Sequence, residues 1–143
     1  YTVVVGGDEN EATAANATAI GGAANTASAT KSTTIGGNGN TASGTFSIAV
    51  GGATLIASGA NSAAIGGNTS DVAGNYAIVV GGNDNETNSQ YASVFGGLEN
   101  TSTSGSYATV IGGRENSASG ANSLAVGGNG TAVTAANDVE YGD

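Results

Sequence analysis

A pair of glycines recurs along this chain at an almost constant interval, and this repeat limits the possible folds more than any other feature. The first glycines of the pairs are Gly6, Gly21, Gly36, Gly51, Gly66, Gly81, Gly96, Gly112 and Gly127. Every step is 15 residues except that from Gly96 to Gly112, which is 16. A unit this short cannot bury a hydrophobic face alone, so neighbouring units must stack. We expect the extra residue to bulge outward within the polar segment 101–104, without disturbing the strands beside it.

The residue before each glycine pair forms the strictest apolar column of the repeat. This column comprises Val5, Ile20, Ile35, Val50, Ile65, Val80, Phe95, Ile111 and Val126. Period-2 alternation places it on the same side of a strand as the residues two positions earlier, such as Val3 and Leu124. The residues between the two columns are mostly small and apolar and face the other way. We therefore predict that the strict column forms a subunit contact or the interior of the coil, and alternation alone does not decide which.

A turn follows each glycine pair, and in six units it ends in Asn: Asn10, Asn25, Asn40, Asn85, Asn100 and Asn116. Glycine adopts a positive φ without steric cost and Asn tolerates the left-handed region, so we expect these residues to form a corner. A second short run centred on Ala follows, as in residues 41–44 and 117–120. Two strands and two corners per unit predict an all-β fold, a parallel β-roll or β-solenoid with 15-residue coils. We expect a single repeat domain over residues 1–143, with about ten rungs, cut from a longer protein.

The chain has little apolar bulk for a solenoid of this length. Of its 143 residues 26 are Gly, and only 24 are Val, Ile, Leu or Phe. Such a composition is close to that of disordered chains, but disorder would not keep an aliphatic residue in phase through every unit. Burial of so few side chains offsets only part of the conformational entropy lost on folding. We therefore expect several copies to pack side by side as an obligate homo-oligomer.

The formal net charge is −9, and most of the acidic residues follow the glycine pairs. We expect them to line one solvent-facing corner, either as a solvated edge or as a cation-binding strip: Asp8, Glu9, Glu11, Asp84, Glu86, Glu99 and Glu115. The acidic balance argues against nucleic acid and anionic membrane surfaces as partners. We predict neither a nucleic-acid partner nor membrane contact from this segment.

The residue types argue against catalysis. The chain has no His or Cys, and Lys31 and Arg114 are its only basic side chains. Residues 81–86 resemble a fragment of a calcium-binding repeat, but the aspartate does not recur in the neighbouring units, so we predict a structural turn there. A row of threonines of the kind that an ice-binding solenoid needs begins at Thr18 and Thr33 but is broken by Ile48. We predict no enzyme activity, no catalytic residue, no cofactor and no metal site.

Three tyrosines occupy the same position of consecutive units. Tyr76, Tyr91 and Tyr107 each begin a main strand, so they should stack at a spacing of about 4.8 Å. One interpretation is an aromatic ladder that packs at a strand end or between subunits. The other is an exposed adhesive strip, because tyrosine offers a large contact area at low entropic cost.

Several units resemble the YadA-like head domain of trimeric autotransporter adhesins. The resemblance is carried by S-I-A-V-G-G at residues 47–52, N-S-A-A-I-G-G at 61–67 and N-S-L-A-V-G-G at 122–128, and it spans essentially the whole chain. It implies a left-handed parallel β-roll, a homotrimer, and a position outside the cell at the bacterial surface, with attachment to the outer membrane through a region absent here. It also implies binding to a host extracellular-matrix or cell-surface protein without catalysis.

The repeat also departs from the commonest form of these heads. Its unit has 15 residues and a double glycine, whereas many YadA-like heads have a slightly shorter unit with one glycine. The residues also admit an alternative, a structural or phage-tail-type segment of a trimeric fibre that has no adhesive role of its own.

Overall fold

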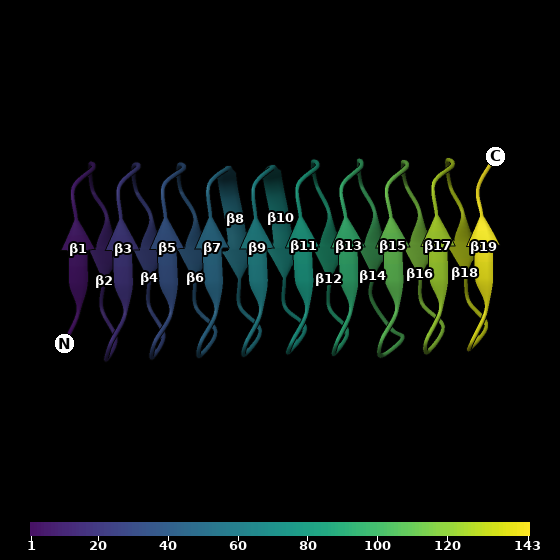
Figure 1. Cartoon of the computed structure of the whole chain (residues 1–143), viewed down its shortest axis with the longest axis horizontal. Helices are drawn as coiled ribbons and strands as arrows, with labels where there is room; N and C mark the ends of the chain where they lie inside the picture. Colours follow the sequence, from purple (N-terminus) through teal and green to yellow (C-terminus); the bar gives the residue numbers. More distant parts are fainter.

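The computed structural model describes all 143 residues and contains strands and turns but no helix. The chain winds as a parallel β-solenoid of about nine turns, which forms two sheets (Figure 1). The ten-stranded sheet contains the odd-numbered strands, and we call it the odd sheet: β1 (Val3–Val5), β3 (Thr18–Ile20), β5 (Thr33–Ile35), β7 (Ile48–Val50), β9 (Ala63–Ile65), β11 (Ile78–Val80), β13 (Ser93–Phe95), β15 (Thr109–Ile111), β17 (Leu124–Val126) and β19 (Val139–Tyr141).

The nine-stranded sheet lies behind it in Figure 1 and contains the even-numbered strands, so we call it the even sheet. Its strands are β2 (Glu11–Ala12), β4 (Thr26–Ala27), β6 (Thr41–Ala42), β8 (Ala53–Ala57), β10 (Asn68–Val72), β12 (Glu86–Thr87), β14 (Thr101–Ser102), β16 (Ser117–Ala118) and β18 (Ala132–Val133). The prediction of an all-β parallel solenoid is therefore confirmed.

The register of both sheets confirms the 15-residue coil. Val4 pairs with Ala19 in the odd sheet, for example, and the same offset continues along the stack. In the longer coil, Thr87 still pairs with Ser102 before the extra residue, and β15 pairs with β13 and β17 after it. The additional residue is accommodated in the loop between β14 and β15, as expected, and neither sheet is interrupted.

The middle residue of each odd strand from β3 to β17 points into the coil. These residues are almost all fully buried, and they are Ala19, Thr34, Ala49, Ala64, Val79, Val94, Val110 and Ala125. They face small buried residues of the even sheet, such as Ala42 and Val72. The interior is therefore narrow and filled by small side chains. The column before the glycine pairs lies on the outside of the coil, which answers the question that alternation left open.

The second glycine of each pair lies where two coils touch. A Cβ atom on Gly82, for example, would overlap the carbonyl oxygen of Gly97 in the next coil and the side-chain amide of Asn85. Its φ of +83° also lies in the left-handed region that favours glycine. The first glycine differs, because a Cβ atom on Gly81 would meet nothing within 4 Å.

The corner asparagines do not adopt the conformation that we predicted. The residue before each of them takes the left-handed conformation, as Asp84 does with a φ of 58° and Glu99 with a φ of 56°. Five of the asparagines are instead fully buried inside the coil: Asn25, Asn40, Asn85, Asn100 and Asn116. The prediction was wrong because turns leave backbone groups inside the coil that need hydrogen-bond partners, and an amide side chain can supply them.

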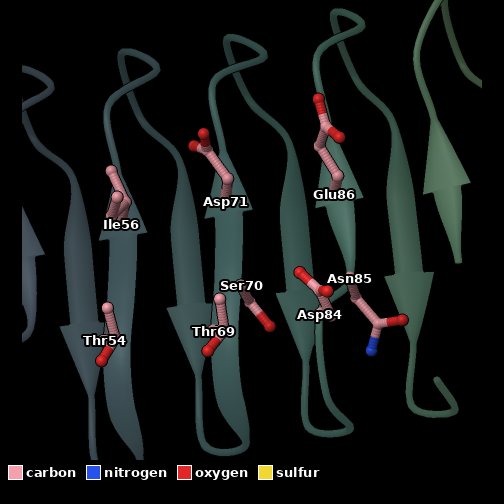
Figure 2. A pocket seen from close by; sticks show the side chains of 8 residues that line it. All are labelled: Thr54, Ile56, Thr69, Ser70, Asp71, Asp84, Asn85 and Glu86. Atoms are coloured by element: carbon pink, nitrogen blue, oxygen red, sulfur yellow. The ribbon is translucent and has the colours of Figure 1, made fainter. Parts of the chain in front are cut away.

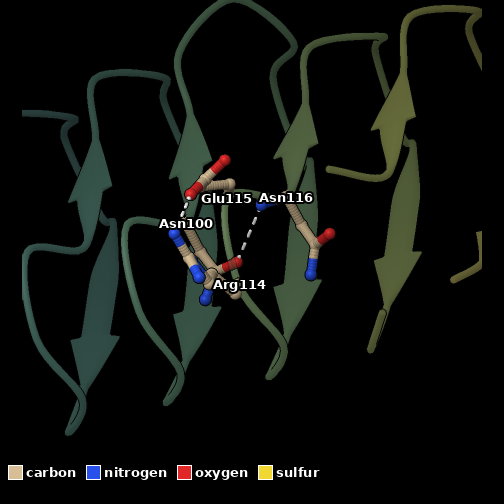
Figure 3. A network of polar contacts seen from close by, with 4 residues as sticks. All are labelled: Asn100, Arg114, Glu115 and Asn116. Carbon is tan, nitrogen blue, oxygen red and sulfur yellow. Dashed lines mark hydrogen bonds and ion pairs between the residues drawn. The ribbon is translucent and has the colours of Figure 1, made fainter. Parts of the chain in front are cut away.

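These buried asparagines connect consecutive coils. The Oδ1 atom of Asn100 accepts a hydrogen bond of 3.0 Å from the backbone N–H of Asn116, one coil further on (Figure 3). The Nδ2 group of Asn100 donates to the carbonyl oxygens of Gly96 and Gly113, both at 3.1 Å. Each amide thus satisfies backbone groups of its own coil and of the next one. We call this column the asparagine ladder.

Candidate interaction surfaces

The outer face of the odd sheet is exposed and mostly apolar, with Thr18, Thr33, Ser93 and Thr109 as its polar members. It is formed by the column before the glycine pairs and the column two positions earlier, and we call it the odd-sheet face. Ile20 is 39% exposed, Phe95 43% and Ile111 44%. Neither column contains a charged side chain. The predicted column therefore does not fill the coil, and its role as a subunit contact stays a prediction: Val5, Ile20, Ile35, Val50, Ile65, Val80, Phe95, Ile111 and Val126.

The outer face of the even sheet has a different composition. The column that points outward there is mostly polar, and it comprises Glu11, Thr26, Thr41, Ile56, Asp71, Glu86, Thr101, Ser117 and Ala132. Such a surface can face water without a covering layer. The two sheets thus share one coil, but the odd sheet has an uncharged, mostly apolar outer face and the even sheet a mostly polar one that carries carboxylates.

A shallow hollow lies on the even-sheet side, between the corner and the outward column (Figure 2). It is lined by Thr54, Ile56, Thr69, Ser70, Asp71, Asp84, Asn85 and Glu86. Asp71 and Glu86 are register partners on the neighbouring strands β10 and β12. Partial burial raises the pKa of Asp71, and the nearby negative charge of Glu86 raises this pKa further. No group of three or more His, Cys, Asp or Glu side chains is close enough to hold a metal ion.

The acidic residues are divided between two places, whereas we had expected one corner. Four of them occupy the left-handed corner position: Glu9, Asp84, Glu99 and Glu115. Glu11 and Glu86 lie on even strands instead. Glu115 forms an exposed ion pair of 2.7 Å with Arg114 (Figure 3). Asp71 was missed in the sequence, although its position 15 residues before Glu86 identifies it as the neighbour of that carboxylate.

The three tyrosines form the ladder that their spacing predicts. The ring centroids of Tyr76 and Tyr91 are 5.0 Å apart with planes inclined by 12°, and those of Tyr91 and Tyr107 are 4.7 Å apart with planes inclined by 3°. All three have a left-handed backbone, with φ between 59° and 62°. Tyr107 is 57% exposed and Tyr91 39%. The stacking is confirmed, and the partner of the ladder stays a prediction.

Other members of the same column also contact their neighbours in the stack. The Lys31 Nζ atom lies 4.7 Å from the centroid of the Phe46 ring, and the Asn122 Nδ2 group donates to Asn137 Oδ1 at 3.1 Å. The column therefore forms one continuous edge of the odd sheet, and the glycine pairs form the opposite edge.

No protein-family model matches the chain, and no curated protein matches its sequence. None of its elements is a helix of the length and apolarity that crossing a membrane requires.

Proposed function

We propose that this chain is the head of a bacterial surface adhesin, which acts as a homotrimer and works by binding and not by chemistry. In this proposal it lies outside the cell, attached to the outer membrane through a region absent here. Its partners are further copies of itself and a host extracellular-matrix or cell-surface protein. The observation that carries the proposal is the uncharged, exposed odd-sheet face on a chain with a net charge of −9.

This face supports side-by-side association for two reasons. Large contiguous apolar surfaces are rare on monomeric soluble proteins and mark interaction sites. Copies that each carry a charge of −9 also repel one another unless they meet through an uncharged surface, and the odd-sheet face is such a surface. A second copy presents the same columns at the same spacing between coils. The number of three subunits and the left-handed coil come from the resemblance of residues 47–52, 61–67 and 122–128 to YadA-like heads.

Binding is favoured over catalysis by the side chains that are available. The chain has no His or Cys, and one of its two basic side chains, Arg114, is paired with Glu115. What the coil offers is a rigid rod with long, regular surfaces. Binding proteins use such surfaces, with exposed aromatic residues among the preferred contacts.

The adhesive role is tested by measuring binding of the purified chain to immobilised host matrix proteins and to cultured host cells. We expect saturable binding that a soluble excess of the same chain competes away. A chain that assembles but binds none of these surfaces would contradict the adhesive role. It would favour instead the alternative of a structural or phage-tail-type trimeric fibre segment, for which the uniform coil is equally suited.

A further inference from the structure

The two edges of the odd sheet differ in bulk. Along the edge where the strands begin, each coil carries a side chain in the left-handed conformation, and three consecutive coils carry Tyr76, Tyr91 and Tyr107. Along the edge where the strands end, every coil carries the first glycine of a pair, such as Gly81 and Gly96. These edges are the lower and upper ends of the front strands in Figure 1. One edge of the odd-sheet face therefore projects, and the other is bare.

The first glycines leave room for a side chain, although their left-handed backbone favours glycine. Their φ values lie between 62° and 69°, and sixteen residues other than glycine have positive φ in this chain, including Tyr107 at 62°. A Cβ atom at any first glycine would meet nothing within 4 Å, whereas one at most of the second glycines would overlap the next coil. The space beside the first glycines is thus open, and a neighbouring molecule can enter it.

On the opposite edge, the coil does not explain why three units carry tyrosine. A left-handed backbone is unfavourable for tyrosine but well tolerated by asparagine. Asparagine occupies the same column at Asn61 and Asn122, so the coil does not need an aromatic ring there. Stacking covers the ring faces between neighbours in the ladder, and all three tyrosines nevertheless remain exposed. The ladder therefore forms an exposed aromatic surface that extends over three consecutive coils at this edge of the odd sheet.

Further copies of the chain can cover both edges. In a closed ring of identical subunits, each subunit contacts its neighbour through two different surfaces. If the odd-sheet faces turn toward the axis of the ring, the projecting edge of one copy meets the bare edge of the next. Because both edges repeat once per coil, three rings can meet three consecutive glycines in register. The odd-sheet face that continues between the edges is uncharged, so the approach brings no like charges into direct contact across it.

We propose that the tyrosine ladder of one copy packs against the column of first glycines of the next copy, and that this seam closes the oligomer. The inference rests on the homotrimer of the proposed function and specifies how its subunits meet. It also gives the open space beside the first glycines an occupant.

Asparagine substitutions test the seam in the whole chain. One variant combines Tyr76→Asn, Tyr91→Asn and Tyr107→Asn, and a second combines Gly81→Asn, Gly96→Asn and Gly112→Asn. The matched control places asparagine in the same left-handed conformation on the even-sheet side of the glycine corner, through Thr54→Asn, Thr69→Asn and Asp84→Asn. Sedimentation equilibrium should show at least a tenfold weaker association for both test variants. The control should keep the association of the unmodified chain, and circular dichroism should show β-structure in all of them.

A cysteine cross-link tests the contact even if an asparagine variant fails to fold. Tyr91→Cys is combined in turn with cysteine at Gly81, Gly96 or Gly112. These glycines are separated from Tyr91 within one chain by a strand of the odd sheet, which is too long for a disulfide, whose Cα atoms must lie within about 7 Å. A disulfide in any combination must therefore join two chains. We expect one of the three combinations to give covalent trimers under oxidation, and each single cysteine variant to give none.

The outcomes separate this inference from the proposed function. If the unmodified chain is a monomer, the proposed homotrimer and the seam both fail. If the unmodified chain is a trimer, but both asparagine variants remain trimers and no cysteine pair cross-links, the seam is wrong and the homotrimer stands. Loss of host binding by a tyrosine variant that remains a trimer would also overturn the seam, because it would assign the ladder to an external partner.

Discussion

The outer faces of the two sheets carry different residue types in the same coils. Both belong to the same coils and have parallel strands in the same register, yet the odd sheet presents Ile35 and Ile65 where the even sheet presents Thr41 and Asp71. The even sheet demonstrates that the coil accepts polar outward side chains. The aliphatic columns of the odd sheet are therefore not required to form the coil, and in the proposed assembly they contact another copy of the chain.

Charged substitutions on the odd-sheet face should have the largest effect on self-association. We expect Ile35→Asp combined with Ile65→Asp to weaken self-association by at least about 100-fold, because each contact would bury an unpaired carboxylate. Thr26→Asp combined with Thr41→Asp places the same charges on the even sheet and should change the association little. Sedimentation equilibrium measures both. If both variants associated equally strongly, the odd-sheet face would have no special role in self-association.

The asparagine ladder connects the coils that carry both faces. Breaking it should have the next largest effect, a loss of folding stability. Asn100→Leu leaves the N–H of Asn116 and the carbonyl oxygens of Gly96 and Gly113 without their amide partner. We expect a loss of about 2 to 4 kcal/mol in the free energy of unfolding, since each unsatisfied buried group costs about 1 to 3 kcal/mol. Urea unfolding monitored by circular dichroism measures it. Asn83→Leu, in a column outside the ladder, is the control and should change the stability by less than 1 kcal/mol, roughly.

The carboxylate pair of the even sheet should make stability depend modestly on pH. The pKa of Asp71 is raised above its ordinary value of 3.8 in the folded chain, so the folded state binds this proton more tightly than the unfolded state. The resulting destabilisation is fully present above the raised pKa and disappears as the pH falls below 3.8. Asp71→Asn should therefore be more stable than the unmodified chain at neutral pH, and the difference should shrink on acidification. Thermal unfolding between pH 7 and pH 3 measures this, and a difference independent of pH would contradict it.

The smallest effect on stability and association is expected for Ile56, the one large apolar residue in the outward column of the even sheet. Ile56 is 37% exposed, close to the value for Ile65 on the odd sheet, so the two residues are matched in burial within the chain. Ile56→Thr should change the free energy of unfolding by less than about 0.5 kcal/mol and leave the mass in solution unchanged. Ile65→Thr should weaken association measurably, because Ile65 lies on the proposed contact face. Similar results for the two substitutions would indicate that exposure alone governs these positions.

Much of this architecture could be predicted from the repeat. The 15-residue period, the two strands per coil, the position of the extra residue and the stacking of Tyr76 on Tyr91 all follow from residue spacing, because parallel strands bring equivalent residues together. Alternation could not predict which face of the odd strands is buried, because Ala and Val occupy one side and Val and Ile the other. Only the closure of a narrow coil selects the smaller residues for the interior.

The role of the asparagines could not be predicted because the same residue type suits two environments. Asn tolerates a left-handed corner, and it also satisfies backbone groups inside a coil. The position one residue earlier accepts Ala24, Thr54 and Glu99 in the left-handed conformation. That position carries no common residue type, so nothing in the repeat identifies it as the corner. The choice depends on where the chain turns, which is a property of the assembled coil.

The mass of the unmodified chain in solution tests the central claim most directly. Sedimentation equilibrium over a range of concentrations should give about three times the chain mass of 13.4 kDa, with the odd-sheet face protected from solvent in the assembly. A well-folded species of 13.4 kDa at all concentrations would contradict the account, because the aliphatic columns of the odd sheet would then be stable in water without a partner.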